Sequence, residues 1–200
     1  MSAKVYDIYI VGLGGQGVLT IGELLAHATL QKGWPVNFYP TKGMSQRGGF
    51  TQGQLRIGRT TVGSAIPPQG ADLIISMERS EALKGIRFAQ KGTDFLLYDL
   101  VWPTSQMLMG QAKYPELADV QSEIKATGSK LITLSDKDLP LVNGVPVYAN
   151  MFILGSVLKN TTLAGLFSYD EIVAAMRTFF DKGLESNLTA LEAGFHATVQ

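Results

Sequence analysis

The chain has 200 residues, of which 46% are hydrophobic and none is cysteine, and its formal net charge is zero. Without cysteine it cannot form disulfides, thiolate zinc sites, cysteine nucleophiles or self-contained iron–sulfur clusters. The balanced charge and the lack of any apolar run of about 18 residues predict neither nucleic-acid binding nor a membrane span. A chain of this length can bury one sizeable core, so we expect a single domain over residues 1–200.

Strand and helix patterns alternate along the first two thirds of the chain. Apolar runs typical of buried strands occupy residues 5–11, 36–39, 73–76, 95–98 and 131–134, with a short candidate at 145–148. Helical patterns follow the first and third of these runs, over residues 17–31 and 78–90. The polar and apolar alternation of residues 54–57 predicts an extra, half-exposed strand. This order predicts an α/β fold, with a Rossmann-like, mostly parallel sheet wrapped by helices.

The last third of the chain is predicted to be helical. Ser168 and Glu171 have the spacing of a capping box, which begins a helix over residues 168–181. A further apolar stripe predicts a second helix over residues 184–198. We expect this C-terminal helical elaboration either to cover the sheet or to meet a partner subunit.

The first strand runs into a glycine-rich turn in which Gly12, Gly14 and Gly17 have the spacing of a dinucleotide-type turn. We expect Gly12 to end the strand, Gly14 to let backbone N–H groups approach a ligand, and Gly17 to let the helix pack closely on the strand. The positive end of that helix would then favour a phosphate. The alternative is a purely architectural corner between strand and helix.

The second strand lacks the residue that a dinucleotide site needs. An acidic side chain at its end would bond the ribose hydroxyls, yet residues 34–40 contain no Asp or Glu. Residues 24–71 contain no acid at all, which predicts a local anionic ligand or an acidic partner, unless the bases simply form a solvated face. The bases in this span are Lys32, Lys42, Arg47, Arg56 and Arg59.

A second glycine-containing segment, Thr-Lys-Gly-Met-Ser-Gln-Arg-Gly-Gly at residues 41–49, follows the second strand. It should therefore lie at the same sheet edge as the glycine turn. Its bases suit a loop that closes over a charged ligand or inserts into a neighbour, and the alternative is a flexible crossover loop. The candidate ligand-binding residues of the two segments are Gly12, Gly14, Gly15, Gln16, Gly17, Lys42, Ser45, Arg47, Gly48 and Gly49.

No residue set supports catalysis by the chain alone, and we expect no catalytic residue and no metal ligand. His27 lies on a polar helix face with Glu23 and Gln31 one turn away. Ser45 and Ser76 have no histidine at motif spacing, so a catalytic triad is not supported.

Three segments occur together in this chain: Gly-Leu-Gly-Gly-Gln-Gly-Val-Leu at residues 12–19, the segment at 41–49, and Gln-Leu-Arg-Ile-Gly at 54–58. Their combination resembles the gamma domain of the 2-oxoacid:ferredoxin oxidoreductases, and most closely the beta subunit of the indolepyruvate type. The resemblance extends over nearly the whole chain, through residues 72–82, 150–155 and 187–194.

This resemblance implies a cytoplasmic complex that oxidatively decarboxylates a 2-oxoacid, passes electrons to ferredoxin and releases an acyl-coenzyme A. It implies that thiamine diphosphate, magnesium and iron–sulfur clusters are carried by thiamine-binding and ferredoxin-like partner subunits, with coenzyme A as a substrate. The chain itself would bind no cofactor tightly. It would act as a lid that contributes an interface and anion contacts at its two glycine segments.

The segment at 41–49 departs from part of the family. Many gamma domains of the pyruvate and 2-oxoglutarate enzymes have Tyr-Gly-Pro-Glu-Ala-Arg-Gly-Gly there, and the indolepyruvate type more often has His at the position of Lys42. Within the resemblance, this favours an aryl pyruvate as substrate. The alternative function is a free-standing nucleotide-binding enzyme that uses the same glycine turn.

Overall fold

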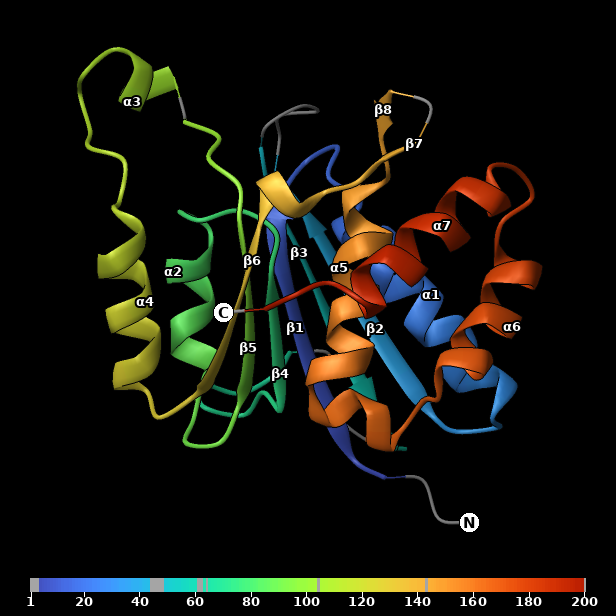
Figure 1. The fold of residues 1–200 in the computed structure, drawn as a ribbon. Coiled ribbons are helices and arrows are strands. Elements are labelled where there is room, and N and C mark those ends of the chain that lie inside the picture. Colours follow the sequence, from blue (N-terminus) through green and yellow to red (C-terminus); the bar gives the residue numbers. More distant parts are fainter. Residues whose placement is uncertain are drawn as a thin grey trace.

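The computed structural model describes residues 4–43, 49–60, 63, 65–103, 105–142 and 144–199. Six strands of this part of the chain form one sheet in the order β2-β3-β1-β4-β5-β6. The strands are β1 (Tyr6–Leu13), β2 (Val36–Lys42), β3 (Phe50–Ile57), β4 (Leu73–Ser76), β5 (Asp94–Asp99) and β6 (Lys130–Ser135). Since β1, β4, β5 and β6 run parallel, their ends define a carboxyl edge and an amino edge, at the top and bottom of Figure 1.

The prediction of a half-exposed extra strand was wrong about its exposure. That strand is β3, which lies between β1 and β2 and runs antiparallel to both. Its polar residues are buried because each has a partner: the Gln54 side-chain oxygen accepts the Ile66 N–H at 2.6 Å, and the Arg56 guanidinium bonds the Asp7 carboxylate. In this strand the alternation of polar and apolar residues therefore indicates that both faces are buried, one lined by apolar side chains and the other by polar side chains with partners.

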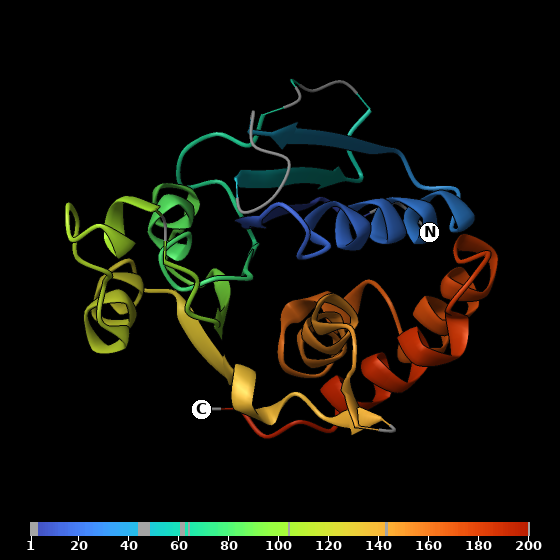
Figure 2. The same cartoon turned by 90° about the horizontal axis from the view of Figure 1, so that it is seen from above.

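Helices cover both faces of the sheet (Figure 2). One face carries α1 (Val18–Gln31), α5 (Ala149–Asn160), α6 (Tyr169–Phe179) and α7 (Leu184–Phe195), and the other carries α2 (Ala82–Gly85) and α4 (Leu117–Ala126). The short elements are α3 (Ser105–Leu108), β7 (Leu141–Val142), β8 (Val145–Pro146) and the 3-10 turns η1 (Ile86–Phe88), η2 (Asp136–Asp138) and η3 (Thr162–Gly165). The fold prediction, an α/β domain with a mostly parallel sheet wrapped by helices, is confirmed.

Two element predictions need correction. The expected helix at 78–90 is only α2 and the 3-10 turn after it, because the Glu78 carboxylate accepts the Glu81 N–H at 2.9 Å and holds the chain in a turn before α2. The expected strand at 145–148 pairs only with β7, outside the main sheet. It stops there because Tyr148 already forms the N-cap of α5.

The C-terminal helices form a second layer. The predicted capping box is present: Ser168 accepts the Glu171 N–H and Glu171 accepts the Ser168 N–H. α6 packs on α1 and α7 packs on α5, so the two helices cover other helices and not the sheet itself. The α5–α7 contact depends on glycine, since a Cβ at Gly155 or Gly194 would collide with backbone carbonyl oxygens of the opposite helix. No helix of the described ranges has the length and apolarity needed to cross a membrane.

Candidate functional site

The carboxyl end of β1 corrects the expected role of the first glycine. β1 continues through Leu13, so Gly12 is a strand residue and does not end the strand. A Cβ at Gly12 would lie 2.6 Å from the side-chain oxygen of Gln16 and 2.9 Å from Val18. Gly12 therefore makes room for the turn to fold back over the strand end.

The turn itself spans Gly14 to Gly17 and touches the second glycine segment. The Gly14 N–H donates to the Gly49 carbonyl at 2.8 Å, so the two segments lie at one edge, as predicted. Since this bond uses the Gly14 N–H, the amides of this turn that remain open to a ligand are those of Gly15 and Gly17. Inside the turn, the Gln16 side-chain oxygen accepts the Leu13 N–H at 2.7 Å, which stabilises the loop without any ligand.

The helix that follows has an open N-terminus. Gly17 is the N-cap at φ 82°, no side chain caps the helix, and its first turn contains no acid. The first intrahelical bond runs from the Ile21 N–H to the Gly17 carbonyl, so the amides before Ile21 have no intrahelical acceptor. In the described part of the chain, the Gly15 and Gly17 amides also lack acceptors. This end of α1 therefore presents donors and a positive dipole to its surroundings.

Gly17 has a different packing role from the one expected. A Cβ at this position would lie 2.8 Å from the Asn150 side-chain carbon at the start of α5. Gly17 thus lets α5 approach the start of α1, and it does not serve the contact between α1 and its own strand. Two helix N-termini consequently meet at the carboxyl edge.

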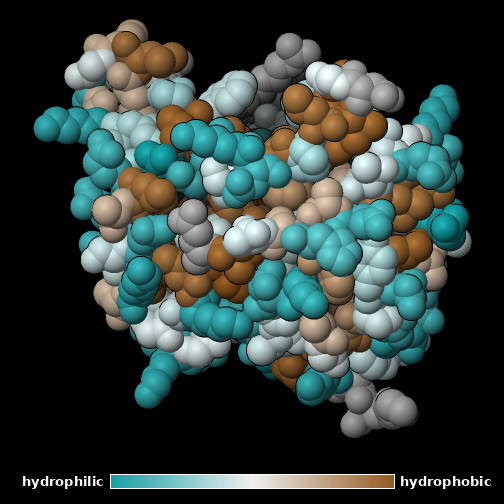
Figure 3. Space-filling view, in the orientation of Figure 1, coloured by the Kyte–Doolittle hydropathy of each residue, from teal (hydrophilic) through white to brown (hydrophobic). Residues whose placement is uncertain are grey.

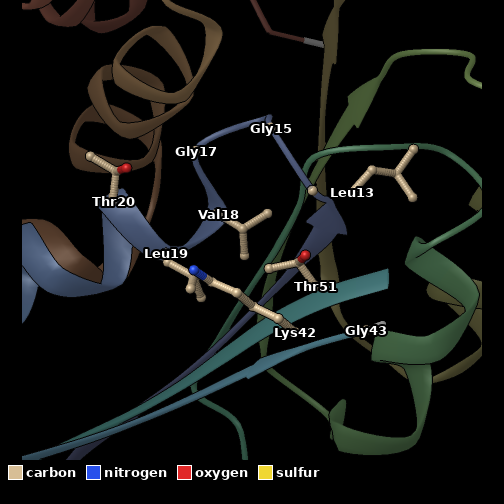
Figure 4. A pocket seen from close by; sticks show the side chains of 10 residues that line it. Leu13, Gly15, Gly17, Val18, Leu19, Thr20, Lys42, Gly43 and Thr51 are labelled. Atoms are coloured by element: carbon tan, nitrogen blue, oxygen red, sulfur yellow. The ribbon is translucent and has the colours of Figure 1, made fainter. Parts of the chain in front are cut away.

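A cavity of about 620 Å³ lies in front of the open helix end, between α1 and the β2–β3 hairpin. In Figure 4 the Lys42 side chain reaches from β2 toward Leu19 at the start of α1. Thr20 and Thr51 also line the cavity, and the Thr51 hydroxyl donates to the Gly49 carbonyl at 3.4 Å. Backbone amides, hydroxyls and one ammonium group are donors that suit a phosphate or another oxyanion.

Lys42 differs from the other described bases of the acid-free span. Lys32 pairs with Glu171 at 2.6 Å, and Arg56 and Arg59 both pair with Asp7, so these three bases need no external anion. Lys42 is exposed and has no hydrogen bond or ion pair to any described residue. Among the described bases of residues 24–71, Lys42 is therefore the one that is available to an external anion.

A smaller cavity of about 260 Å³ lies on the other side of the glycine turn. Its polar lining comes from Gln16, Asn150, Tyr98 and Tyr148, of which only Gln16 was predicted from the sequence. The buried Gln16 side-chain nitrogen has no partner among the described residues. Burial, followed by Asp136 and Asp138, raises the pKa of Tyr98 to about 12, which keeps its hydroxyl a neutral donor at physiological pH.

Comparison with known proteins agrees with this geometry. The family model described as pyruvate ferredoxin/flavodoxin oxidoreductase matches residues 7–197. The chain belongs to this family. It is 32% identical to the indolepyruvate oxidoreductase subunit IorB of Thermococcus kodakarensis, over 97% of this chain and 96% of the relative.

Two solved structures share the fold. Pyruvate oxidoreductase subunit PORC of Thermotoga maritima matches with a TM-score of 0.69 at 19% identity, over 98% of both chains. A chain of the 2-oxoglutarate:ferredoxin oxidoreductase of Magnetococcus marinus, solved with 2-oxoglutarate, coenzyme A and succinyl-CoA bound, matches with a TM-score of 0.57 at 16% identity. That match covers 96% of this chain but 30% of the other, so the same fold occurs both as a separate subunit and inside a longer polypeptide.

The remaining predicted residues of this oxidoreductase family member are placed as follows. Gly15 lines both cavities at φ 97°. Ser45, Arg47 and Gly48 lie outside the described residues, so their predicted ligand role stays a prediction. His27 bonds the Thr178 hydroxyl at 2.8 Å and joins α1 to α6, which is a structural role. Within the described ranges no three His, Asp or Glu side chains are grouped as a metal site would require.

Among the residues of the two cavities that were not predicted, three show which signal was missing. Thr20 could have been found, because the third residue after a predicted helix N-cap lies in the open first turn. Thr51 required the strand register, in which it pairs with Gly12 across β1 and β3. Asn150 required the approach of α5 to α1, which no local pattern encodes.

Proposed function

We propose that this chain is the gamma-type subunit of a complex that oxidatively decarboxylates a 2-oxoacid to an acyl-coenzyme A, and that the larger cavity binds the phosphate-bearing end of coenzyme A. The observation that carries the proposal is the convergence of unpaired donors on one cavity. The open amides of α1 and the unpaired Lys42 face the same space. No described acidic side chain lines that space to compete with an anionic ligand.

The donors suit a phosphate better than they suit a neutral ligand. Coenzyme A carries several phosphate oxygens, each an acceptor for amide, hydroxyl and ammonium groups. A charge-assisted hydrogen bond contributes about 1.5–3 kcal/mol, so a single such bond changes affinity roughly tenfold to a hundredfold. Lys42 is the described residue best placed to supply it, and Arg47 of the neighbouring segment remains a second candidate from the sequence.

The same proposal assigns the redox chemistry to other polypeptides. A chain without cysteine offers no thiolate for an iron–sulfur cluster, so thiamine diphosphate, magnesium and the clusters belong to the thiamine-binding and ferredoxin-like subunits. Ferredoxin would be the acceptor of the whole complex. An aryl pyruvate is the proposed substrate, supported by the segment at 41–49 and by the IorB relative. The cytoplasmic location expected from the sequence also stays a prediction.

The alternative, a free-standing dinucleotide enzyme, has less support from the geometry. In a dinucleotide fold, the second strand lies beside β1 and ends in an acid that binds the ribose. Here β3 lies between β1 and β2, and β2 ends in Lys42 instead of an acid. A ribose placed beside the glycine turn would have no carboxylate at the expected position.

The coenzyme A dependence of the assembled complex tests the proposal. We expect Lys42→Ala to raise the apparent coenzyme A requirement roughly tenfold to a hundredfold, while decarboxylation of the 2-oxoacid in the absence of coenzyme A stays nearly unchanged. Lys125→Ala, an exposed lysine at the end of α4, is the matched control and should change neither. An unaltered coenzyme A requirement in the Lys42 variant would refute the ligand site.

Equilibrium dialysis of the isolated chain separates the two candidate functions. The subunit proposal expects no tight binding of NAD, FAD or ATP by the chain alone. Tight binding of any of them without a partner would favour the free-standing enzyme.

A further inference from the structure

Most of the exposed large hydrophobic side chains gather in two protrusions. Of twelve such residues in the described part of the chain, eight lie in residues 100–112, here the β5 protrusion, or in residues 139–148, here the hairpin protrusion. Their exposed fractions range from 41% to 75%. They are Val101, Trp102, Leu108 and Met109 in the first and Leu141, Val142, Val145 and Tyr148 in the second.

Both protrusions rise from the carboxyl edge of the sheet. The β5 protrusion follows the end of β5 and contains α3, while the hairpin protrusion follows β6 and contains β7 and β8 (Figure 1). Figure 3 shows hydrophobic surface over both regions at the top of the molecule. Residues 100–112 and 139–148 contain no charged side chain. A partner for these surfaces must therefore offer apolar contacts and not ionic ones.

The β5 protrusion is held in place from below. Glu78, fully buried at the end of β4, accepts the Trp102 N–H at 3.2 Å and the hydroxyl of Tyr114. Burial raises the pKa of Tyr114, and the hydrogen bond to Glu78 raises it further, so the phenol remains a donor. Arg79 adds an ion pair with Asp99 at 2.6 Å.

The hairpin protrusion is also ordered by backbone bonds. β7 and β8 pair at Leu141–Pro146 and Val142–Val145, and the Val147 N–H donates to the Pro140 carbonyl at 3.1 Å. Because this backbone is already ordered, a partner that covers the apolar side chains does not have to order the loop as well. Exposed apolar patches of this kind usually mark a site where another protein binds.

We propose that the β5 and hairpin protrusions together form the docking surface for the subunit that carries the reacting centre of the oxidoreductase complex. This inference rests on the proposed function. At the exposures given above, the eight side chains present an area on the order of the 800 Å² that each partner of a stable complex buries. That area fits a lasting contact between subunits.

The position of the surface supports this occupant. The smaller cavity beside the glycine turn lies where the two protrusions begin. It is lined by Tyr98 and Leu100 next to the β5 protrusion and by Val147 and Tyr148 of the hairpin protrusion. A subunit seated on both protrusions would therefore close over the turn and bring its own centre to any ligand bound there. In the Magnetococcus chain the same fold occupies 30% of a longer polypeptide, so further protein is covalently connected to it there.

The C-terminal helices offer no comparable surface. The apolar stripes of α6 and α7, which the sequence allowed as an interface, pack against the main core, with Phe179, Phe180, Leu184 and Leu188 partly buried there. We therefore place the proposed interface at the carboxyl edge and not on these helices.

Association with the separately purified thiamine diphosphate-binding subunit tests the surface. We expect the pair Leu108→Ser and Met109→Ser, and separately the pair Leu141→Ser and Val145→Ser, to weaken the dissociation constant at least tenfold, and all four together to abolish binding. Leu30→Ser is the matched control, since Leu30 is 62% exposed near the end of α1 at the amino edge. Thermal melting checks that each variant folds, and hydrogen exchange of the wild-type chain should slow in both protrusions when the partner is added.

Each other outcome overturns the inference. Variants that bind like the wild-type chain, with no slowing of exchange in either protrusion, overturn the surface but leave the coenzyme A site standing. A wild-type chain that does not associate overturns both the surface and the proposed function. A chain that dimerises alone through these residues, with unchanged affinity for the other subunit, assigns the surface to a second copy instead.

Discussion

The two edges of the sheet treat their polar and apolar groups in opposite ways. At the amino edge, the buried Asp7 receives both Arg56 and Arg59, and Asp94 accepts the N–H and the hydroxyl of Thr162 at 2.6 and 2.7 Å. At the carboxyl edge, α1 begins without a cap and Lys42 has no described partner. Large apolar side chains also stand in solvent there.

This difference shows that the open donors at the start of α1 are a local feature of the carboxyl edge and not a property of the whole described structure. The same chain satisfies buried charges with two-pronged guanidinium contacts at one edge, so unsatisfied donors at the other are not a general looseness of packing. A buried polar group without a partner costs stability, whereas an exposed one such as Lys42 is solvated by water and stays available to a ligand. The amino edge therefore stabilises the fold through buried ion pairs, whereas the carboxyl edge, beside its Glu78 contacts, presents open donors and exposed apolar side chains. Four substitutions test this difference.

The largest effect is expected at the amino edge. Asp7→Asn keeps the shape of the side chain but leaves Arg56, whose side chain is 8% exposed, without its counter-charge. Breaking a buried pair in this way costs about 3 kcal/mol of unfolding free energy. Arg59 contributes less to this loss, because its side chain is 33% exposed and water can solvate its charge. Urea unfolding should show this loss, whereas Asp181→Asn, on an exposed loop, should stay near zero. A loss equal to that of the control would contradict the role of the cluster.

A smaller loss is expected below the β5 protrusion. Tyr114→Phe removes the hydroxyl that bonds Glu78 and leaves part of a buried carboxylate unsatisfied, which costs about 2 kcal/mol. It should also loosen the protrusion and weaken association with the thiamine-binding subunit. Tyr39→Phe is the control, because the Tyr39 side chain is exposed on β2 and its hydroxyl makes no described hydrogen bond. Equal stability and equal affinity of the two variants would show that the bond between Tyr114 and Glu78 does not hold the β5 protrusion in place.

The third effect depends on pH. Lys32 and then the Ser168 N–H lower the pKa of Glu171 from its ordinary value of 4.5, so its stabilisation is present above that value and is lost as pH falls through the lower, folded-state pKa. Glu171→Gln should cost about 0.5 kcal/mol at pH 7, because the pair is exposed. The gap between the two melting curves should close at low pH. A gap that stays constant into strong acid would show that charge is not its source.

The smallest effect on stability is expected at Lys42. Since this side chain is exposed and without a described partner, Lys42→Ala should leave the free energy of unfolding unchanged in urea titration. The same variant should alter coenzyme A dependence, which separates recognition from stability at one residue. Marked destabilisation would show that Lys42 helps to hold the hairpin together.

The sequence was informative wherever the pattern was local. The capping box of α6, the extent of α1 and the positions of the parallel strands along the chain followed from local patterns alone. The burial of β3 did not, because Gln54 and Arg56 are polar, and the partners Ile66 and Asp7 lie 12 and 49 positions away in the chain.

The role of Gly17 could not be predicted for the same reason, because its close neighbour is Asn150, which only the folded chain brings near. Gly12 differs, since its closest neighbours are Gln16 and Val18 of the turn that follows it.

The candidate site was predicted in part. Both glycine segments and Lys42 were found, and their meeting at one edge is confirmed by the bond from Gly14 to Gly49. The apolar protrusions were not found, since Trp102 or Leu141 in a sequence is indistinguishable from a core residue until its exposure is known.

Hydrogen exchange of the assembled complex, with and without coenzyme A, tests the division between the two edges most directly. Coenzyme A should slow exchange at residues 15–20, where every amide except that of Gln16, which donates to the Leu13 carbonyl, lacks a described acceptor, and it should leave residues 56–60 at the amino edge unchanged. Unaltered exchange at residues 15–20 in a complex that has bound coenzyme A, or slowing confined to the amino edge, would contradict this division.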